Sequence, residues 1–326
     1  MKGMTLIKRK WPVLAALGVV LLFCLLLTLT GCGPARGSGP AEETEKPDGI
    51  RLTATTTMLA DLAENIGGGT VEVTGLMGPG IDPHLYQASA GDIAALQQAD
   101  VVLYNGIHLE GKMGDIFASL RDQEKQVICV EDALAPEDLI PSRDSAQNYD
   151  PHIWFDVSLW KKAAAHVAQE LSDYAPKSRE SFEQNLKAYT KQLEELEAYI
   201  TEEAERVPET QRVLITAHDA FEYFGRAYGF EVRGLQGIST ETEAGTQDIS
   251  RLADYITEHR IKAIFTESSV SPKTIEALQA AVHARGFETA LGGSLYSDSL
   301  GDGESGAGSY ILTCKANIET IAAALE

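Results

Sequence analysis

Two short stretches of the sequence share the order Asp-Pro-His. The first is "DPHLY" at residues 82–86, and the second is "DPHIWFD" at residues 150–156. Proline restricts its own φ and biases the preceding residue towards an extended backbone, so His84 and His152 have little conformational freedom left to lose. A third histidine, His218, ends the apolar run "RVLITAH" and is followed by a helical pattern. Three well-fixed imidazoles from distant segments suggest a transition-metal site.

A carboxylate that could complete such a site lies near the end of the chain. Asp298 is in the Gly/Ser-rich segment "GGSLYSDSLGDGESGAG", which can wrap closely around an ion. Dispersed ligands have no diagnostic spacing, so three histidines in loops and an aspartate in an Asx turn remain an alternative explanation. Glu267 ends the apolar run "AIFTE". It could orient a metal-binding histidine, or form a salt bridge or a contact at a helix start.

The sequence gives less support for a functional role of the other four histidines. His166, His259 and His283 fall within helical patterns that have polar neighbours, where an imidazole needs no special role. His108, in "NGIHLEGKMGD", follows the end of a predicted strand. It could line a cleft, but we expect a structural role in its loop.

The segments that must position these side chains alternate between strand and helix patterns. Before residue 176 we expect strands at 51–56, 71–76, 100–105 and 126–130, and helices at 58–68, 89–98, 112–121 and 157–174. After residue 207 we expect strands at 212–218, 230–235, 262–267 and 287–291, and helices at 219–229, 246–260, 271–286 and 315–326. Such alternation is typical of an α/β fold with mainly parallel sheets.

Residues 176–207 between these two sets predict one long helix. Its apolar residues recur at alternating steps of four and three on an otherwise charged segment, which makes a single narrow stripe: Phe182, Leu186, Tyr189, Leu193, Leu196 and Ile200. Pro176 suits the first turn, and Pro208 ends the helix. About thirty residues span roughly 45 Å, so we expect a strut that crosses two lobes. The cleft between the lobes is then the natural ligand site, because open α/β sheets bind ligands beyond the carboxyl ends of their strands.

The N-terminus carries the features of an export signal. Four basic residues within the first ten precede an apolar run from Trp11 to Leu29, and "LTGC" at residues 29–32 resembles the lipobox of bacterial lipoproteins. Cleavage would remove residues 1–31 and leave Cys32 as the lipidated first residue. An uncleaved transmembrane anchor is the alternative, since the apolar run is nearly long enough to span a bilayer. In both cases the globular part lies outside the membrane.

The predicted organisation has four parts after the signal peptide. Residues 32–49 are rich in Gly, Pro, Ser and Glu and form a flexible tether. An N-terminal β/α lobe (50–175), the linking helix (176–207) and a C-terminal β/α lobe (208–326) follow.

Composition restricts the possible partners. The net charge of −21 becomes −25 once the four basic residues of the signal are removed, so we do not expect nucleic acid to bind. Apart from Cys32, the mature chain retains only Cys129 and Cys314. Both lie in apolar stretches that we interpret as strands, which favours two buried thiols over a disulfide.

Seven motifs together resemble one known family, in order and along nearly the whole mature chain. They are "DPHLY", "NGIHLEGKMGD", "DPHIWFD", "LITAHDAFEYFGRAYGF", "GLQGISTETEAG", "AIFTESSVSPKTIEAL" and "LYSDSLG". They are similar to the metal-binding lipoproteins of bacterial zinc and manganese ABC importers, in particular to the treponemal-type zinc/manganese binders. The resemblance implies two β/α lobes joined by a rigid long helix, with the ion in the cleft between the lobes. It also implies four metal ligands: His84, His152, His218 and Asp298.

The resemblance implies a transport function and no enzymatic activity. We expect a monomeric solute-binding lipoprotein, anchored by lipid on the extracytoplasmic face of the cell membrane, that passes Zn²⁺ or Mn²⁺ to an ABC permease and its ATPase. A surface adhesin is one alternative, because relatives on cell surfaces have been credited with adhesion. A metallohydrolase is the other, although four protein ligands would leave no open position for water and no general base is evident.

The sequence lies between the dedicated zinc and manganese binders of this family. Zinc binders often carry a long His- and acid-rich loop, whereas the corresponding stretch here, "PEDLIPSRDSAQNY", is short and lacks histidine. Manganese binders usually have a glutamate where this chain has His218. Three imidazoles and one carboxylate suit Zn²⁺, and the general affinity order places Zn²⁺ above Mn²⁺.

Overall fold

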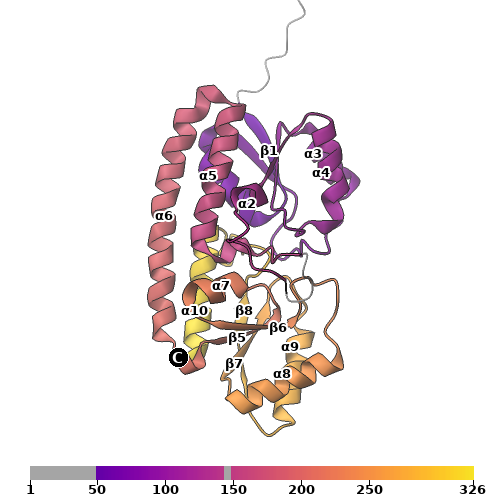
Figure 1. Ribbon diagram of the computed structural model, residues 1–326, viewed down its shortest axis with the longest axis vertical. Helices are drawn as coiled ribbons and strands as arrows, with labels where there is room; N and C mark the ends of the chain where they lie inside the picture. Colours follow the sequence, from indigo (N-terminus) through magenta and orange to yellow (C-terminus); the bar gives the residue numbers. More distant parts are fainter. Residues whose placement is uncertain (1–48, 143–147) are drawn as a thin grey trace, which may run out of the picture. The chain divides into compact units, whose positions relative to one another are not determined.

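Four parallel strands form the sheet of the N-terminal lobe (Figure 1). The computed structural model describes residues 49–142 and 148–326, so the predicted signal peptide, Cys32 and nearly all of the predicted tether lie outside the described residues. The strands are β1 (Ile50–Ala54), β2 (Val71–Gly75), β3 (Val101–Tyr104) and β4 (Gln126–Cys129). They lie in the order β2-β1-β3-β4, and each pair is parallel.

Helices cover both faces of this sheet. They are α2 (Thr57–Gly67), α3 (Ala90–Gln98), α4 (Gly114–Asp122) and α5 (Val157–Tyr174). Strand residues alternate between the two sides: Leu103 packs in the core with α2 and α5, whereas Val102 packs in a second cluster with residues of α3 and α4. The predicted start of α3 at Ser89 is confirmed, since Ser89 and Asp92 form a reciprocal capping box.

The C-terminal lobe repeats the β/α alternation with two parallel strand pairs. The strands are β5 (Val213–His218), β6 (Glu231–Gln236), β7 (Ala263–Glu267) and β8 (Ala290–Leu295). β5 pairs with β6 and β7 pairs with β8, while β5 and β7 lie next to each other. The helices are α7 (Glu222–Tyr228), α8 (Thr246–His259), α9 (Lys273–His283) and α10 (Tyr310–Leu325). The prediction of two mainly parallel β/α lobes is therefore confirmed.

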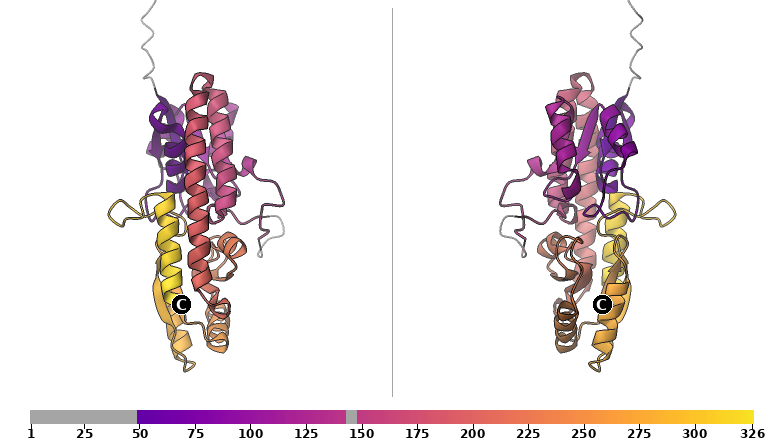
Figure 2. Two further views of the ribbon diagram at one scale, coloured as in Figure 1. Left: turned by 90° about the vertical axis from the view of Figure 1, so that its left-hand side faces the viewer. Right: turned by 90° about the vertical axis from the view of Figure 1, so that its right-hand side faces the viewer.

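The long helix α6 (Arg179–Arg206) packs on both lobes (Figure 2). It contacts α2 and α5 of the N-terminal lobe and α7 and α10 of the C-terminal lobe. The predicted stripe is buried with the exception of Leu186, which is half-buried, and a 3-10 turn at Pro176–Ser178 precedes the α-helix. Polar contacts fix both ends, because Asn185 Nδ2 donates to Ile66 O and Arg206 pairs with Glu326.

Two predictions about the last third of the chain are wrong. The strand expected at 287–291 is β8 at Ala290–Leu295, where Gly292 and Gly293 weaken the strand signal. Gly292 is required there, since a Cβ at this position would lie 2.6 Å from Phe265 Cε1. Cys314 is in helix α10 and not in a strand, because Ser309 caps a helix that already begins at Tyr310.

The two cysteines among the described residues form no disulfide. Cys129 and Cys314 are both free thiols, as predicted; Cys129 is buried as expected, whereas Cys314 is only half-buried. Within residues 49–142 and 148–326, no helix has the length and apolar composition needed to cross a membrane.

Candidate metal centre

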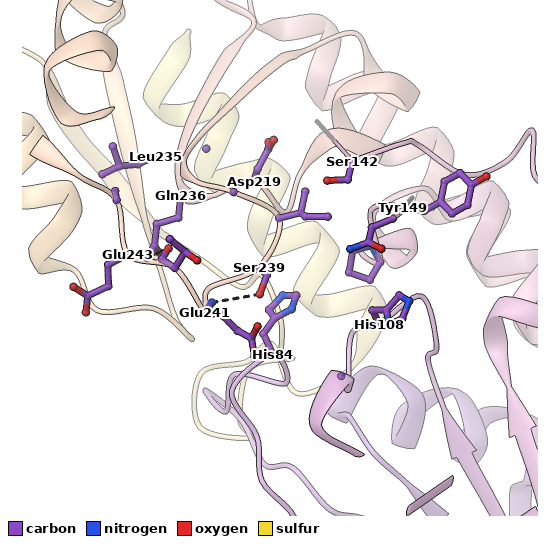
Figure 3. Close-up of a pocket in the computed structure, with 18 of the residues that line it drawn as sticks. His84, His108, Ser142, Tyr149, Asp219, Leu235, Gln236, Ser239, Glu241 and Glu243 are labelled. Carbon is purple, nitrogen blue, oxygen red and sulfur yellow. Dashed lines mark hydrogen bonds between the residues drawn. The ribbon is translucent and has the colours of Figure 1, made fainter. Parts of the chain in front are cut away.

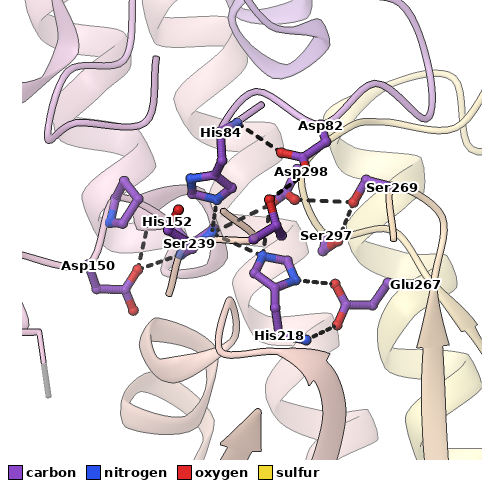
Figure 4. A network of polar contacts seen from close by, with 12 residues as sticks. Asp82, His84, Asp150, His152, His218, Ser239, Glu267, Ser269, Ser297 and Asp298 are labelled. Carbon is purple, nitrogen blue, oxygen red and sulfur yellow. Dashed lines mark hydrogen bonds and ion pairs between the residues drawn. The ribbon is translucent and has the colours of Figure 1, made fainter. Parts of the chain in front are cut away.

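Four side chains converge between the two lobes (Figure 4). His84, His152, His218 and Asp298 each offer one donor atom, and these atoms all lie within 4.8 Å of one another. Nε2 of His152 is 3.3 Å from Nε2 of both other histidines, and Asp298 Oδ1 is 3.4 Å from Nε2 of His152 and of His218. All four residues are at most 5% exposed. The sequence placed these four residues on distant segments, and the fold brings them together.

The two Asp-Pro-His stretches form the same local turn. The backbone N–H of His84 donates to Asp82 Oδ1 at 2.8 Å, and the backbone N–H of His152 donates to Asp150 Oδ1 at 2.9 Å. An aspartate that bonds the backbone two residues on makes an Asx turn, which together with the proline fixes the histidine backbone. The common sequence thus has a common structural reason.

The two aspartates differ in their second contact. Asp150 Oδ1 also lies 2.6 Å from Nδ1 of His152, so it holds the ring as well as the backbone. Asp82 Oδ2 accepts a hydrogen bond from Thr240 Oγ1 of the C-terminal lobe at 2.5 Å. Asp150 therefore orients an imidazole, whereas Asp82 joins the two lobes beside His84.

His218 is held at the end of β5 by the end of β7. Glu267 Oε2 lies 2.6 Å from His218 Nδ1, and Glu267 Oε1 accepts the backbone N–H of His218 at 2.8 Å. Glu267, which the sequence offers as a residue that could orient a metal-binding histidine, thus lies against the ring nitrogen of His218 that faces away from the cluster. Gly234 of β6 allows the backbone of His218 and Asp219 to pack closely against β6, since a Cβ at position 234 would lie 2.4 Å from Asp219 N.

Asp298 follows β8 in a segment fixed by both lobes. Its Oδ2 atom accepts a hydrogen bond from Ser269 Oγ at 3.1 Å. The neighbouring carbonyl of Ser297 accepts from Trp154 Nε1 of the N-terminal lobe at 3.0 Å. Oδ1 is buried and has no hydrogen-bond partner among the described residues. A buried carboxylate oxygen that faces the imidazole nitrogens without a well-formed hydrogen bond is suited to a cation.

The electrostatics of the cluster favour a cation. Burial lowers the pKa of His84 to about 3, so this imidazole is neutral and free to donate its lone pair. Burial acts in the same direction on His152, but Asp150 and Asp298 outweigh it and raise the pKa of His152 to about 9. Asp298 and Glu267 likewise outweigh burial and raise the pKa of His218 well above its usual value. The buried carboxylates therefore favour positive charge at His152 and His218, which either protons or a metal ion can supply.

A cavity of about 870 Å³ opens onto one side of the cluster (Figure 3). Of the four clustered residues, only His84 lines it. His108 also lines this cavity, in a loop where Gly106, Ile107 and His108 all have positive φ. His108 is therefore near the site but outside the cluster of donor atoms.

The remaining histidines have ordinary surroundings. His259 stacks on Tyr255, with ring centroids 4.0 Å apart, and His283 forms an exposed pair with Glu288. His166 is half-buried within α5. All three lie outside the cluster.

The donor set fits a divalent transition metal. Three imidazole nitrogens and one carboxylate oxygen are common ligands of Zn²⁺, and carboxylate partners on the far ring nitrogens are usual around such sites. Sequence reasoning proposed Glu267 for this role but missed Asp150. It also missed Ser269 and Thr240, which donate hydrogen bonds to Asp298 and Asp82. The first could have been found, because Asp150 lies two residues before His152 and can reach its ring.

Comparison with known proteins agrees with this geometry. The family model "Zinc-uptake complex component A periplasmic" matches residues 52–324. The manganese-binding lipoprotein MntA of Bacillus subtilis is 45% identical over 91% of this chain and 95% of its own length. The zinc-binding protein TroA of Treponema pallidum is 45% identical over 91% of this chain and 94% of its own length. A solved structure of the Treponema pallidum protein superposes with a TM-score of 0.82 and covers 85% of this chain and 99% of that one.

Proposed function

Because the chain belongs to the family of zinc-uptake complex component A, we propose that it is the solute-binding lipoprotein of a bacterial ABC importer for Zn²⁺, Mn²⁺ or both. Two relatives that are each 45% identical carry zinc-binding and manganese-binding in their names. The family is one of metal-uptake components and not of enzymes, which sets the metallohydrolase alternative aside. Nothing in the described residues favours adhesion.

The single observation that carries this proposal is the buried cluster of four donor atoms. We propose that His84, His152, His218 and Asp298 bind the transported ion, with Glu267 and Asp150 orienting two of the imidazoles. The ligands come from both lobes, whose proposed limits are residues 50–175 and 208–326. Binding an ion therefore joins the lobes across the cleft, and α6 keeps them in place during capture and release.

The choice of metal follows from the donors. Three imidazoles and one carboxylate match the tetrahedral preference of Zn²⁺, and Mn²⁺ has the lower intrinsic affinity for such donors. Asp298 is the only charged group among the four ligands, so a bound divalent ion leaves the site with one positive charge. The carboxylates of Asp150 and Glu267, which contact His152 and His218, offset this charge. We propose that both ions bind and that Zn²⁺ binds more tightly.

The proposed partners are a permease and its ATPase in the cell membrane. We propose that lipid on Cys32 anchors the chain on the extracytoplasmic face and that the protein acts as a monomer. The lipobox-like "LTGC" and the relative named as a lipoprotein support the anchor.

The test is metal uptake by the native host. A strain that lacks this protein should take up less radioactive zinc or manganese at low supply and recover with excess metal. The metal content of protein purified from that host identifies the cargo. Normal uptake by the deletion strain, together with metal-free purified protein, would contradict the proposal.

A further inference from the structure

The side chain of Trp154 contacts both lobes beside the cluster. Trp154 lies two residues after His152 and is only 3% exposed. Its ring packs edge-to-face on the imidazole of His152, with ring centroids 5.2 Å apart and planes at 70°. Its Nε1 donates to Ser297 O of the C-terminal lobe at 3.0 Å. Because Ser297 directly precedes Asp298, one side chain touches one proposed ligand and holds the backbone next to another.

The segment that carries Asp298 is attached to the N-terminal lobe on both sides of this residue. Three hydrogen bonds make the attachment, at 3.0, 2.8 and 2.8 Å: Trp154 Nε1 to Ser297 O, Gly80 N to Ser299 Oγ, and Leu300 N to Thr57 Oγ1. Of the N-terminal residues in these bonds, Trp154 is the one whose ring also packs on an imidazole of the cluster. Trp154 therefore links the position of Asp298 to that of His152.

The backbone of Trp154 is fixed by the C-terminal lobe as well. Its carbonyl accepts a hydrogen bond from Tyr310 Oη at 2.7 Å. Tyr310 is fully buried at the start of α10. A buried indole N–H and a buried carbonyl each need a partner, and here both partners belong to the other lobe. Trp154 can thus turn neither its ring nor its peptide group without losing a buried hydrogen bond.

We propose that Trp154 is a positioning residue that holds His152 and Asp298 at the spacing that suits the ion. This inference rests on the function proposed above. Oδ1 of Asp298 lies 3.4 Å from Nε2 of His152 (Figure 4). Without the indole N–H, the carbonyl of Ser297 loses this donor, and the segment that carries Asp298 is held less closely to the imidazole. Residues that orient metal ligands typically contribute about 10- to 100-fold to affinity.

Trp160 provides a matched control for a purely structural role. It is also buried, and its Nε1 donates to Tyr189 Oη at 3.2 Å, where α5 packs on α6. Trp154→Phe and Trp160→Phe thus each remove one buried indole donor. If the N–H of Trp154 only stabilised the fold, both variants would lower the melting temperature of the metal-free protein, and neither would alter the metal site.

The test is titration of the mature chain, residues 32–326, with Zn²⁺ against a chelator and with Co²⁺. The visible absorption of bound Co²⁺ depends on its coordination geometry, so it reports the arrangement of the ligands. A third protein removes the N–H while keeping the bicyclic ring. Trp154 is the only tryptophan in the mature Trp160→Phe chain, so growth on benzothienylalanine in place of tryptophan changes residue 154 alone. This analogue has sulfur in place of the N–H, which isolates the hydrogen bond if Trp154→Phe folds poorly.

We expect Trp154→Phe to bind zinc about tenfold less tightly than wild type, and the benzothienylalanine protein about tenfold less tightly than Trp160→Phe. Both should show an altered Co²⁺ spectrum, whereas Trp160→Phe should match wild type in affinity and spectrum. Zinc affinity of the benzothienylalanine protein within about twofold of Trp160→Phe overturns the inference and leaves the proposed function intact. An unchanged Co²⁺ spectrum, or an equal loss of affinity in Trp160→Phe, has the same consequence. Failure of wild type to bind either ion would overturn both.

Discussion

Nδ1 of His218 lies 2.6 Å from Oε2 of Glu267, while the other oxygen of that carboxylate accepts the backbone N–H of the same histidine. His152 has the equivalent contact with Asp150, at 2.6 Å. Two of the three imidazoles are therefore held by a carboxylate on the ring nitrogen that faces away from the cluster. This fixes the ring and leaves Nε2 as the donor to an ion.

Neutralising either carboxylate should weaken metal binding. Glu267→Gln and Asp150→Asn keep the shape but remove the charge, so each should lower zinc affinity by about 10- to 100-fold. The control is Glu288→Gln, which alters an exposed carboxylate beside His283. Competitive titration against a zinc chelator measures the change. Wild-type affinity in both buried variants would contradict the orienting role.

Zinc affinity should keep rising with pH well above neutral pH. Neighbouring carboxylates raise the pKa of His152 to about 9 and that of His218 well above its usual value, so in the metal-free protein both rings favour the protonated form up to a higher pH than a free imidazole. Zinc must displace these protons, whereas His84, with its pKa lowered to about 3, contributes none. Affinity should therefore increase from about pH 6 to about pH 9.

Calorimetry in buffers of different ionisation enthalpy counts the released protons. We expect about two per zinc at pH 7. In the metal-free protein the same raised pKa values stabilise the fold below about pH 6.5, and this contribution is lost as pH rises through about 9. Binding that releases no protons at pH 7 would show that the rings are already neutral.

Gly234 should be needed for the geometry of His218. A Cβ there would lie 2.4 Å from the backbone nitrogen of Asp219, so Gly234→Ala must push β5 and β6 apart. We expect a loss of about 1–3 kcal/mol in the free energy of unfolding, together with weaker zinc binding. Gly69→Ala is the matched control, because a Cβ at that position meets no atom within 4 Å. Urea unfolding of the metal-free variants measures the change, and equal stability of the two would refute the packing argument.

Metal binding should produce little movement of the two lobes. Helix α6 spans both lobes, contains no Pro or Gly from Arg179 to Arg206, and therefore has no inexpensive hinge. X-ray scattering profiles of the metal-free and zinc-loaded protein should nearly coincide. Lys191→Pro, at an exposed position in the middle of α6, supplies a kinked reference. A large closure of the wild-type lobes on zinc binding would be incompatible with a rigid strut.

The sequence predicted most of the fold because periodicity and capping are local signals. Ser89 with Asp92 caps α3 as expected, and the stripe on α6 follows from residue spacing alone. The predicted position of β8 is wrong, because its glycines are explained only by side chains distant in sequence: Phe265 beside Gly292 and Thr320 beside Gly293. The prediction of a strand before Cys314 is wrong, since short apolar runs do not distinguish strand from helix.

The four clustered residues could be proposed from their motifs, whereas most of their partners could not. Ser269 and Thr240 are common polar residues in loops, and their contacts with Asp298 and Asp82 cross between segments far apart in the chain. The first contact depends on the pairing of β7 with β8, and the second depends on how the two lobes meet; no local pattern records either. Asp150 is the exception, since its partner lies two residues away.

The most direct test of the central proposal is calorimetric titration of zinc into wild type and six histidine variants. The proposed ligands are changed in His84→Ala, His152→Ala and His218→Ala, and the controls are His166→Ala, His259→Ala and His283→Ala. We predict losses of orders of magnitude in zinc affinity for the first three variants and wild-type affinity for the controls. Because only the folded state binds the ion, zinc should raise the melting temperature of wild type and the controls alone. Near-wild-type zinc affinity in His84→Ala, His152→Ala or His218→Ala would remove that residue from the site and contradict the proposal of a four-ligand centre.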